Sequence, residues 1–504
     1  MHFARFVGVG TLLATQLLSH ATAANTTCDP LVKGSLPQVF ILTDISNEPD
    51  DQESLVRLLV HSDLYNITGL AAVTSYWLNF TTYPDVVHEV VSNYSTVRDQ
   101  LQSHTTGSFP TAEYLRTIIH GGSNSYGLAA LQEPLSNASS HLISVVDSLN
   151  GPLYIQVWGG ANVLSMALNH VSLTRSQSAI SVFISKLRIY AISDQDNSGF
   201  WIRARFPSIH YISSSHAWNY YGDATWPGIS GEAYYSFDKG GPDTSLVTND
   251  WLAKHIQVGP FGASTYITPT FIMEGDSPSL LFTVQNGLNV PEHPEYGGWG
   301  GRYKPDDLSR VSGSHFGDTF DFVRGANGET FVSNKATIWR WREAFQAEFA
   351  ARMQWTIRNS TKIQHPPVAV VNGNCGFQPL ILQVDPSKTI DLDASSSSSR
   401  DDMQLSFNWT HYREISLTQG NLIEVPEIPI VCKTADCKQV SLTVPNVTIS
   451  CATSLALHPN QSDITCKAFH IILAVKNRVE LGMTRYKRVI LEVKKPANLT
   501  VLEL

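Results

Sequence analysis

The sequence predicts an α/β domain, with an open, mostly parallel sheet and helices on both faces, followed by a smaller β-sandwich. Two patterns in the 504 residues indicate this order. From about residue 38 to residue 355, strand and helix patterns alternate, which is typical of parallel strands joined by helices. Beyond about residue 365, short alternating or β-branched runs are separated by turn-rich segments, which is typical of a sandwich.

The predicted strands of the first domain are short apolar runs bounded by turn residues. They cover residues 39–43, 67–74, 153–158, 187–192, 210–212 and 270–273. Apolar positions at helical spacing follow several of them. These predicted helices cover residues 50–62, 84–93, 161–171 and 335–353. In the second domain, whose pattern is immunoglobulin-like, strands are predicted over residues 368–371, 390–392, 405–409, 440–444 and 469–475.

The N-terminus has the features of a secretory signal peptide over residues 1–23. Arg5 supplies a positive charge, residues 6–18 are mostly apolar, and residues 21–23 have the small-x-small form that precedes cleavage. The apolar run is too short and too broken to span a bilayer, and no later run is long enough. We therefore expect a soluble, secreted, extracellular protein that does not associate with membranes and whose mature chain begins near Ala24.

Six cysteines remain after removal of the signal peptide, and an even number in an oxidising compartment predicts up to three disulfides of open pairing. They are Cys28, Cys375, Cys432, Cys437, Cys451 and Cys466. Asn-x-Ser/Thr sequons predict a glycoprotein. They stand at Asn25, Asn66, Asn79, Asn93, Asn137, Asn359, Asn408, Asn446, Asn460 and Asn498.

Composition excludes several classes of function. The net charge is −9 and there is no long basic run, so nucleic acid is not an expected partner. No Cys/His set has the spacing of a transition-metal site. The chain also lacks a nucleophile elbow and a dinucleotide-binding fingerprint. Nothing in the sequence indicates a protein partner.

The first predicted strand leads directly into a cluster of acids. Asp44 follows the strand, and Asp50 and Asp51 stand in the first turn of the helix after it. In open α/β folds, ligands bind at this carboxyl edge of the sheet. Three acids so close together repel one another unless a cation offsets them, and oxygen ligands suit Ca²⁺ or Mg²⁺. The alternative is an ordinary acidic first turn capped by Asn47.

This strand followed by Asp and Asp-Asp resembles the N-terminal metal motif of nucleoside hydrolases, with five rather than three residues in between. The longer form resembles the nucleoside hydrolase-like domain of microbial proteins described as cellulose-binding. Further matches stand at residues 157–162, 193–196, 274–278 and 297–303. The runs 470–475 and 484–490 resemble the immunoglobulin-like β-sandwich domain that accompanies it. The resemblance implies domains over residues 33–362 and 368–500.

The resemblance also implies roles for individual residues. Asp44 matches the acid that holds the ion and activates its water, so it is the expected catalytic residue. Asp50 matches the acid that binds a sugar hydroxyl, and Asp51 the principal metal carboxylate. Asn162, through its backbone carbonyl, and Asp276 match the remaining metal ligands. Four oxygen groups from separate strand ends imply Ca²⁺.

Other residues near the matched motifs are expected to bind substrate. They are Asn47, Trp158, Asp194, Asp196, Glu274 and Trp299. The alternatives are an Asx turn for the two aspartates and packing for the tryptophans. Other tryptophans near strand ends, with the same two interpretations, stand at positions 77, 201, 218 and 226.

Two departures from the family pattern bear on the substrate. Gly275 stands where some nucleoside hydrolases have the His that protonates the leaving base, and the loop that grips ribose is replaced, which puts nucleosides in doubt. The leaving-group acid is left open among Glu274, His216 and His293.

The predicted function is that of a secreted, calcium-dependent hydrolase of glycosidic or N-glycosidic bonds in a saccharide or sugar conjugate. The mechanism implied is attack by metal-activated water. The alternative from another class is a non-catalytic carbohydrate-binding protein, which the missing leaving-group acid favours. A third hypothesis is a nucleosidase.

Overall fold

The computed structural model describes residues 36–217, 220–306, 314–417, 422–453, 464–497 and 499. The predicted signal peptide, Cys28 and Trp218 lie outside these residues. Within the described residues, no helix combines the length and the apolar character that a membrane crossing requires.

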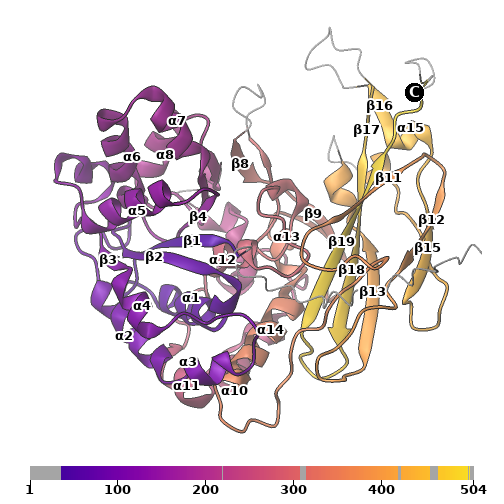
Figure 1. Ribbon diagram of the computed structural model, residues 1–504, viewed down its shortest axis with the longest axis horizontal. Helices are drawn as coiled ribbons and strands as arrows, with labels where there is room; N and C mark the ends of the chain where they lie inside the picture. The colour runs from indigo at the N-terminus through magenta and orange to yellow at the C-terminus, as the bar shows by residue number, and fades with distance from the viewer. Residues whose placement is uncertain are drawn as a thin grey trace, which may run out of the picture.

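An eight-stranded sheet forms the centre of the first domain (Figure 1). Its order is β3 (Ile119–Gly121), β2 (Asn66–Ala72), β1 (Gln38–Thr43), β4 (Leu153–Val157), β5 (Leu187–Ala191), β6 (His210–Ile212), β8 (His315–Asp318), β7 (Tyr303–Pro305). All neighbours pair in parallel except β7 and β8. A separate ribbon pairs β9 (Asp321–Arg324) with β10 (Thr330–Ser333).

Side chains of β1 alternate between two buried cores because successive residues of a strand point to opposite faces. Val39 and Ile41 belong to a core shared with Leu55 and Leu59 of α1. Phe40 belongs to a second core on the other face, shared with α5 and α6. The predicted α/β class, with helices on both faces of a mostly parallel sheet, is therefore confirmed.

The helices of the first domain lie on both faces of this sheet (Figure 1). They are α1 (Pro49–Val60), α2 (Pro84–Ser95), α3 (Arg98–Gln102), α4 (Ala112–Thr117), α5 (Asn137–Ser148), α6 (Asn162–Thr174), α7 (Gln177–Ser185), α8 (Ser198–Arg205), α9 (Glu232–Tyr235), α10 (Asn249–His255), α11 (Gly259–Thr265), α12 (Ser277–Thr283), α13 (Ala336–Trp339) and α14 (Arg342–Trp355). Among the 3₁₀ turns, η4 (Tyr221–Asp223) and η5 (Trp226–Ile229) lie near the site described below.

The second domain is a β-sandwich, as predicted. One sheet has the order β11 (Leu380–Val384), β19 (Thr484–Val493), β18 (Ala468–Asn477), β13 (Leu405–His411). The other has the order β12 (Thr389–Asp393), β15 (Gln439–Thr443), β14 (Ile430–Cys432). The pair β16 (Cys451–Thr453) and β17 (Ile464–Cys466) and the short α15 (Val447–Ser450) complete the domain.

Disulfides are concentrated in this sandwich, as the cysteine positions predict. Cys432 pairs with Cys437, and Cys451 pairs with Cys466. Cys375 is disulfide-bonded as well.

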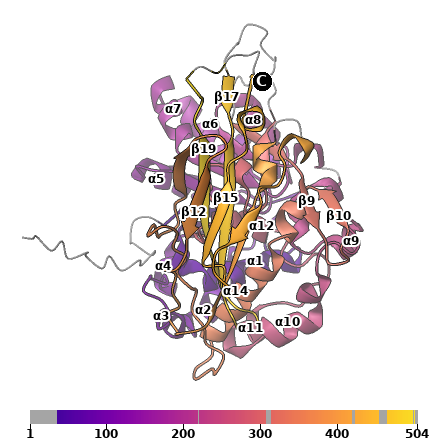
Figure 2. The ribbon, with the colours of Figure 1, turned by 90° about the vertical axis from the view of Figure 1, so that its right-hand side faces the viewer.

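The sandwich packs closely against the first domain through β19, and Figure 2 shows its strands in front of that domain. Arg485 of β19 pairs with the buried Glu348 of α14 at 2.5 Å. Arg488 donates to the carbonyl oxygens of Leu288 at 2.7 Å and Gly297 at 2.8 Å. The two domains therefore share buried, charged contacts rather than a loose linker.

Two predicted elements of the first domain are wrong. Residues 270–273 are not a strand but an irregular segment before α12, because a short apolar run predicts burial and not the kind of element. The helix predicted over residues 335–353 is broken into α13 and α14, with Trp341 outside helical geometry at the start of the second.

Residues 368–371 form only isolated bridges rather than the strand predicted there.

Candidate functional site

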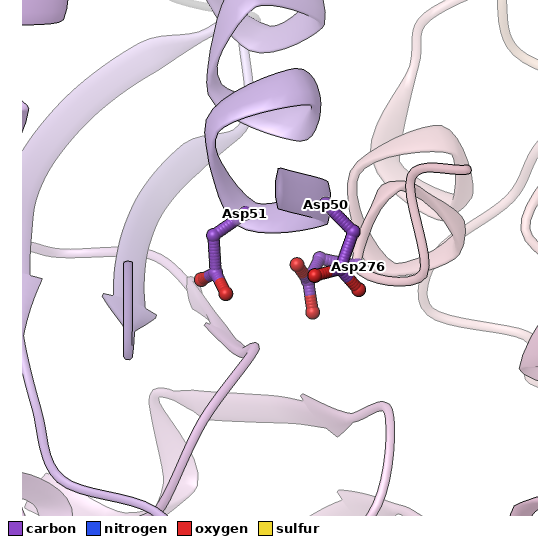
Figure 3. A group of neighbouring side chains, drawn as sticks. All are labelled: Asp50, Asp51 and Asp276. Carbon is purple, nitrogen blue, oxygen red and sulfur yellow. The ribbon is translucent and has the colours of Figure 1, made fainter. Parts of the chain in front are cut away.

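Three carboxylates from distant parts of the chain meet at the carboxyl edge of the sheet. Asp50 and Asp51 lie in the first turn of α1, which Pro49 opens. Asp276 lies at the start of α12 and faces them (Figure 3). Ligand oxygens of the three side chains all lie within 4.8 Å of one another. The chain thus gathers acids at the position where α/β folds bind ligands.

Asp44 joins this group from the end of β1. Its side chain is buried, and its Oδ1 atom has no hydrogen-bond partner among the described residues. A Cβ atom on Gly159, after β4, would lie 2.6 Å from that Oδ1. The neighbouring Thr43 donates its hydroxyl to Asp51. A glycine at position 159 is therefore needed for the ends of β1 and β4 to enclose the Asp44 carboxylate.

Burial and mutual repulsion change the acidity of these groups. Burial, and then the charges of Glu48 and Asp44, raise the pKa of Asp50 to about 8. Burial also raises the pKa of Asp44 to about 6. The pKa values of Asp51 and Asp276 are well above their usual range, first through burial and then through the neighbouring acids. With no basic side chain among the described lining residues to offset them, these carboxyl groups favour either protonation or binding of a cation.

The acids open into a cavity of about 210 Å³. The acidic residues that line it are Asp44, Glu48, Asp50, Asp51 and Asp276. Its aromatic lining comes from Trp77, Trp158, Tyr221, Trp226, Tyr234, Tyr235 and Phe271. Among the described lining residues, none is Lys, Arg or His.

Two more of the expected substrate-binding residues line this cavity. Asn47 lies at its exposed edge, and Glu48, not Asn47, occupies the N-cap position of α1. Trp158 is fully buried and donates its indole N–H to Ser279 Oγ at 2.8 Å. This hydrogen bond to α12 therefore fixes the orientation of the Trp158 ring.

Asp194 and Asp196 hold the loop after β5 rather than line the cavity. Asp194 forms an ion pair with Arg203 at 2.5 Å. Asp196 Oδ1 accepts from the backbone N–H of Ser198 at 2.7 Å, and burial raises the pKa of Asp196 to about 6. Gln195, between them, does line the cavity and donates to the Trp158 carbonyl at 2.5 Å.

Glu274 is a buried partner of Arg57 and lies outside the cavity lining. Arg57 Nη2 donates to Glu274 Oε1 at 3.0 Å, and both side chains are fully buried. Glu53, one turn earlier on α1, accepts from the Glu274 backbone N–H at 2.9 Å. Helix α1 therefore carries Asp50 and Asp51 and also fastens the loop that brings Asp276 to them.

Trp299 and Asn162 also lie outside the cavity lining. Trp299 donates its indole N–H to the Tyr486 hydroxyl at 3.3 Å, so it packs against the second domain. The side-chain amide of Asn162 donates to Thr74 Oγ1 at 3.0 Å, and its backbone carbonyl accepts from Ser165 Oγ at 2.9 Å.

The three candidates for the leaving-group acid lie elsewhere too. Besides Glu274, His216 is exposed and lies 3.4 Å from Asp318, and His293 interacts with Glu295 at 3.0 Å. Glu48, which was not among the residues predicted from the sequence, lines the cavity instead. Its position between Asp44 and Asp50 could have indicated it.

Comparison with known proteins adds the family. Residues 38–303 match the model of the family described as cellulose-binding Sde182, nucleoside hydrolase-like domain. The chain belongs to this family. Residues 389–493 match the model described as cellulose-binding protein Sde0182, C-terminal domain. The family predicted from the sequence is thus confirmed for both parts of the chain.

A solved structure of high similarity agrees with this assignment. A nucleoside hydrolase-related hypothetical protein from Saccharophagus degradans, associated with carbohydrate metabolism, matches with a TM-score of 0.70 and 29% identity. The match covers 91% of this chain and 100% of that one. The effector protein XOO4466 also matches, with a TM-score of 0.33 and 12% identity over 63% of this chain and 95% of that one.

The inosine-uridine preferring nucleoside hydrolase from Bacillus anthracis matches with a TM-score of 0.31 and 12% identity, over 62% of this chain and 99% of that one. No curated protein matches the chain.

Proposed function

We propose that this member of the Sde182 family is a calcium-dependent hydrolase that cleaves a glycosidic or N-glycosidic bond in a saccharide or sugar conjugate. The proposal depends on one observation: carboxylate oxygens of Asp50, Asp51 and Asp276 lie within 4.8 Å of one another in a cavity without basic side chains. Buried charges of one sign are unfavourable unless a counter-ion accompanies them.

The chemistry of the donors suits a hard divalent cation. Asp44 Oδ1 and Asp276 Oδ2 are buried and have no hydrogen-bond partner among the described residues, so each offers an oxygen to a ligand. Together with Asp51 these side chains would hold Ca²⁺, which prefers several oxygen ligands. The Asn162 carbonyl, which the resemblance adds to the set, remains part of the proposal. Such a cation lowers the pKa of water in hydrolytic sites.

In the proposed reaction, each acidic side chain of the cavity has a separate role. Asp44 accepts a proton from the attacking water, and Asp50 accepts a hydrogen bond from a sugar hydroxyl. Glu48 is the acid we assign to the leaving group, because it lines the cavity and burial raises the pKa of its carboxyl. A carboxylic acid with a raised pKa is the usual donor in glycoside hydrolysis.

The family description supports a carbohydrate as the ligand, because both matched models carry the words cellulose-binding. The same words favour a second candidate function, a non-catalytic carbohydrate-binding protein on this scaffold. The two candidates share the ligand and differ in whether Asp44 and Glu48 perform chemistry.

Turnover assays on a panel of glycans and nucleosides, with and without chelator, test the proposal. Asp44→Asn should lower kcat by about 10²- to 10⁴-fold while ligand affinity is largely kept. Glu48→Gln should slow natural glycosides more than nitrophenyl glycosides, whose leaving group departs without a proton. Binding of cellulose without cleavage of any panel compound would favour the second candidate.

Secretion is also part of the proposal. Disulfides such as Cys432–Cys437 and Cys451–Cys466 are typical of proteins that fold in an oxidising compartment. The sequon residues Asn79, Asn359 and Asn408 are exposed and accessible to glycosylation. Mass spectrometry of the protein from a secreting host should find a mature N-terminus near Ala24 and glycans that an endoglycosidase removes.

A further inference from the structure

Six aromatic side chains form a continuous row across the mouth of the acidic cavity. In order of contact they are Trp77, Tyr221, Trp226, Tyr235, Tyr234 and Phe271, and we call them the aromatic track. Successive ring centroids lie between 4.7 and 6.4 Å apart. The rings come from the loop after β2, from η4, η5 and α9, and from the segment before Glu274.

Exposure changes along the track. The outer rings are about half exposed, at 52% for Trp77, 55% for Tyr234 and 53% for Phe271. Tyr221 and Tyr235 are half-buried, and the central Trp226 is only 4% exposed. The rings at both ends of the track are therefore open to solvent, whereas the ring at its centre is buried. Exposed rings that are scattered singly are common, but a contiguous group of them often marks a ligand-binding groove.

The centre of the track touches the acid cluster. A Cβ atom on Gly275 would lie 3.1 Å from the Trp226 ring and 2.6 Å from Asp50 Oδ2, so the ring and the carboxylate flank the same backbone position. The acids, Trp226 and both exposed ends of the track line the same cavity, so a ligand that contacts both ends lies beside the acids.

The acidic lining of the cavity excludes some classes of ligand. Its described lining has five acidic side chains and no basic one, so anionic chains such as nucleic acids or uronate polymers are repelled. Aromatic faces and tyrosine hydroxyls instead offer apolar surface beside polar groups. A neutral saccharide has the matching combination of C–H faces and hydroxyls.

We propose that the aromatic track binds a neutral saccharide chain of several sugar units, which lies across the acidic site with units on both sides of it. This inference rests on the proposed function and specifies its substrate class: a chain engaged along its length rather than a single sugar or a nucleoside. It also assigns carbohydrate binding to the first domain and not to the sandwich.

Calorimetric titration in an Asp44→Asn background, which prevents turnover, tests the track with defined probes. The probes are cellohexaose, xylohexaose, mannohexaose, cellobiose and inosine. At least one hexasaccharide should bind more tightly than the disaccharide and inosine. Trp77→Ala and Phe271→Ala should each weaken hexasaccharide binding by about two- to tenfold, and the two losses should multiply in the double variant.

Tyr114→Ala is the matched control. Tyr114 is 45% exposed, and its hydroxyl donates to the carbonyl of Ile67 at 2.8 Å, at the opposite edge of the sheet. This variant should leave affinity unchanged. Trp77→Phe should restore most of the affinity that Trp77→Ala loses, and thermal unfolding should show that all variants fold.

The track would be overturned if no hexasaccharide bound, if inosine bound more tightly, or if only one end of the track affected affinity. These outcomes separate it from the proposed function. Hydrolysis by wild type that does not depend on Trp77 and Phe271 would keep the hydrolase and overturn the track. Binding that depends on both rings, without hydrolysis by wild type, would keep the track and overturn the hydrolase.

Discussion

Two buried charge clusters in this protein differ in one respect. At the contact between the domains, Glu348 and Asp63 are paired with Arg352 and Arg485, and we call this group the seam network. Near the end of β1, the acids of the cavity have no Lys, Arg or His beside them among the described lining residues. Burial alone would raise the pKa of Glu348, but Arg485 and Arg352 outweigh it and lower that pKa to about 2.

The pKa of Asp50, by contrast, is raised to about 8. Burial thus raises the pKa of an acid unless nearby arginines outweigh it. Two arginines do so at Glu348, whereas the pKa of Asp63, which pairs with Arg352, stays raised by burial. Buried ion pairs hold elements of the fold together, whereas buried acids without a basic partner favour binding of a cation.

The largest expected effect is on stability when the seam network is broken. Glu348→Gln leaves Arg352 and Arg485 without their shared buried partner and should lower the free energy of unfolding by about 3–5 kcal/mol. Urea denaturation measures it. Glu343→Gln is the control, because Glu343 on the same helix pairs with Lys476 at the surface and should cost less than about 1 kcal/mol. Similar losses in the two variants would contradict the distinction.

The next effect is the response to calcium. The cation should stabilise the wild-type protein by about 2.7 kcal/mol when present at about 100 times its Kd, because it neutralises the unbalanced cluster. Thermal unfolding with calcium and with chelator measures this difference. Asp51→Asn should abolish most of it, while Glu348→Gln should retain it. An equal Tm with and without calcium in wild type would remove the basis for a cation site.

The two clusters should also respond to pH in opposite directions. In chelator, Asp44 and Asp50 have raised pKa values, so the folded state holds protons that the unfolded state releases, and stability falls as pH rises from about 4 towards 8. Each such proton contributes about 1.4 kcal/mol per pH unit. Glu348 stabilises the fold above its ordinary pKa of 4.5, and this contribution is lost as pH falls towards 2.

Denaturation of the chelated protein between pH 2 and pH 8 should therefore show maximal stability near the middle of that range, with calcium restoring the alkaline side only. Calcium that restored the acid side instead would mean that the charge assignment is wrong.

The smallest effect is a gain. In chelator, Asp276→Asn removes a buried carboxyl from a group of acids that repel one another when ionised, and it should raise the free energy of unfolding at neutral pH by about 1 kcal/mol. Asp321→Asn, the same change at a carboxylate balanced by Arg302 and Arg340, should lower it. The sign of the two changes, measured by urea denaturation, is the sharpest comparison between the two kinds of buried acid.

The sequence could predict the local half of the site. Asp44, Asp50 and Asp51 follow an apolar strand and open a helix, and that local pattern gives their place at the sheet edge. The approach of Asp276 was implied only by the family resemblance. What fixes it, the contact of Arg57 with Glu274, joins residues 217 positions apart, and no local pattern indicates such a pairing.

Trp299 shows a second limit. It was expected to bind substrate, but its indole N–H donates to Tyr486 of the second domain, so the alternative of packing applies. Two rings of the aromatic track, Trp77 and Trp226, were among the tryptophans considered for substrate binding. The other four come from short segments without periodicity, so no local pattern indicated them.

The contacts of β19 have a practical consequence for anyone who wishes to divide the chain. Expression of residues 36–362 alone would leave Glu348 without Arg485 and would expose the carbonyl groups that Arg488 occupies. Such a truncated product should aggregate or unfold, so grafting this sandwich onto another domain, or exchanging it for a different module, requires redesign of α14 as well.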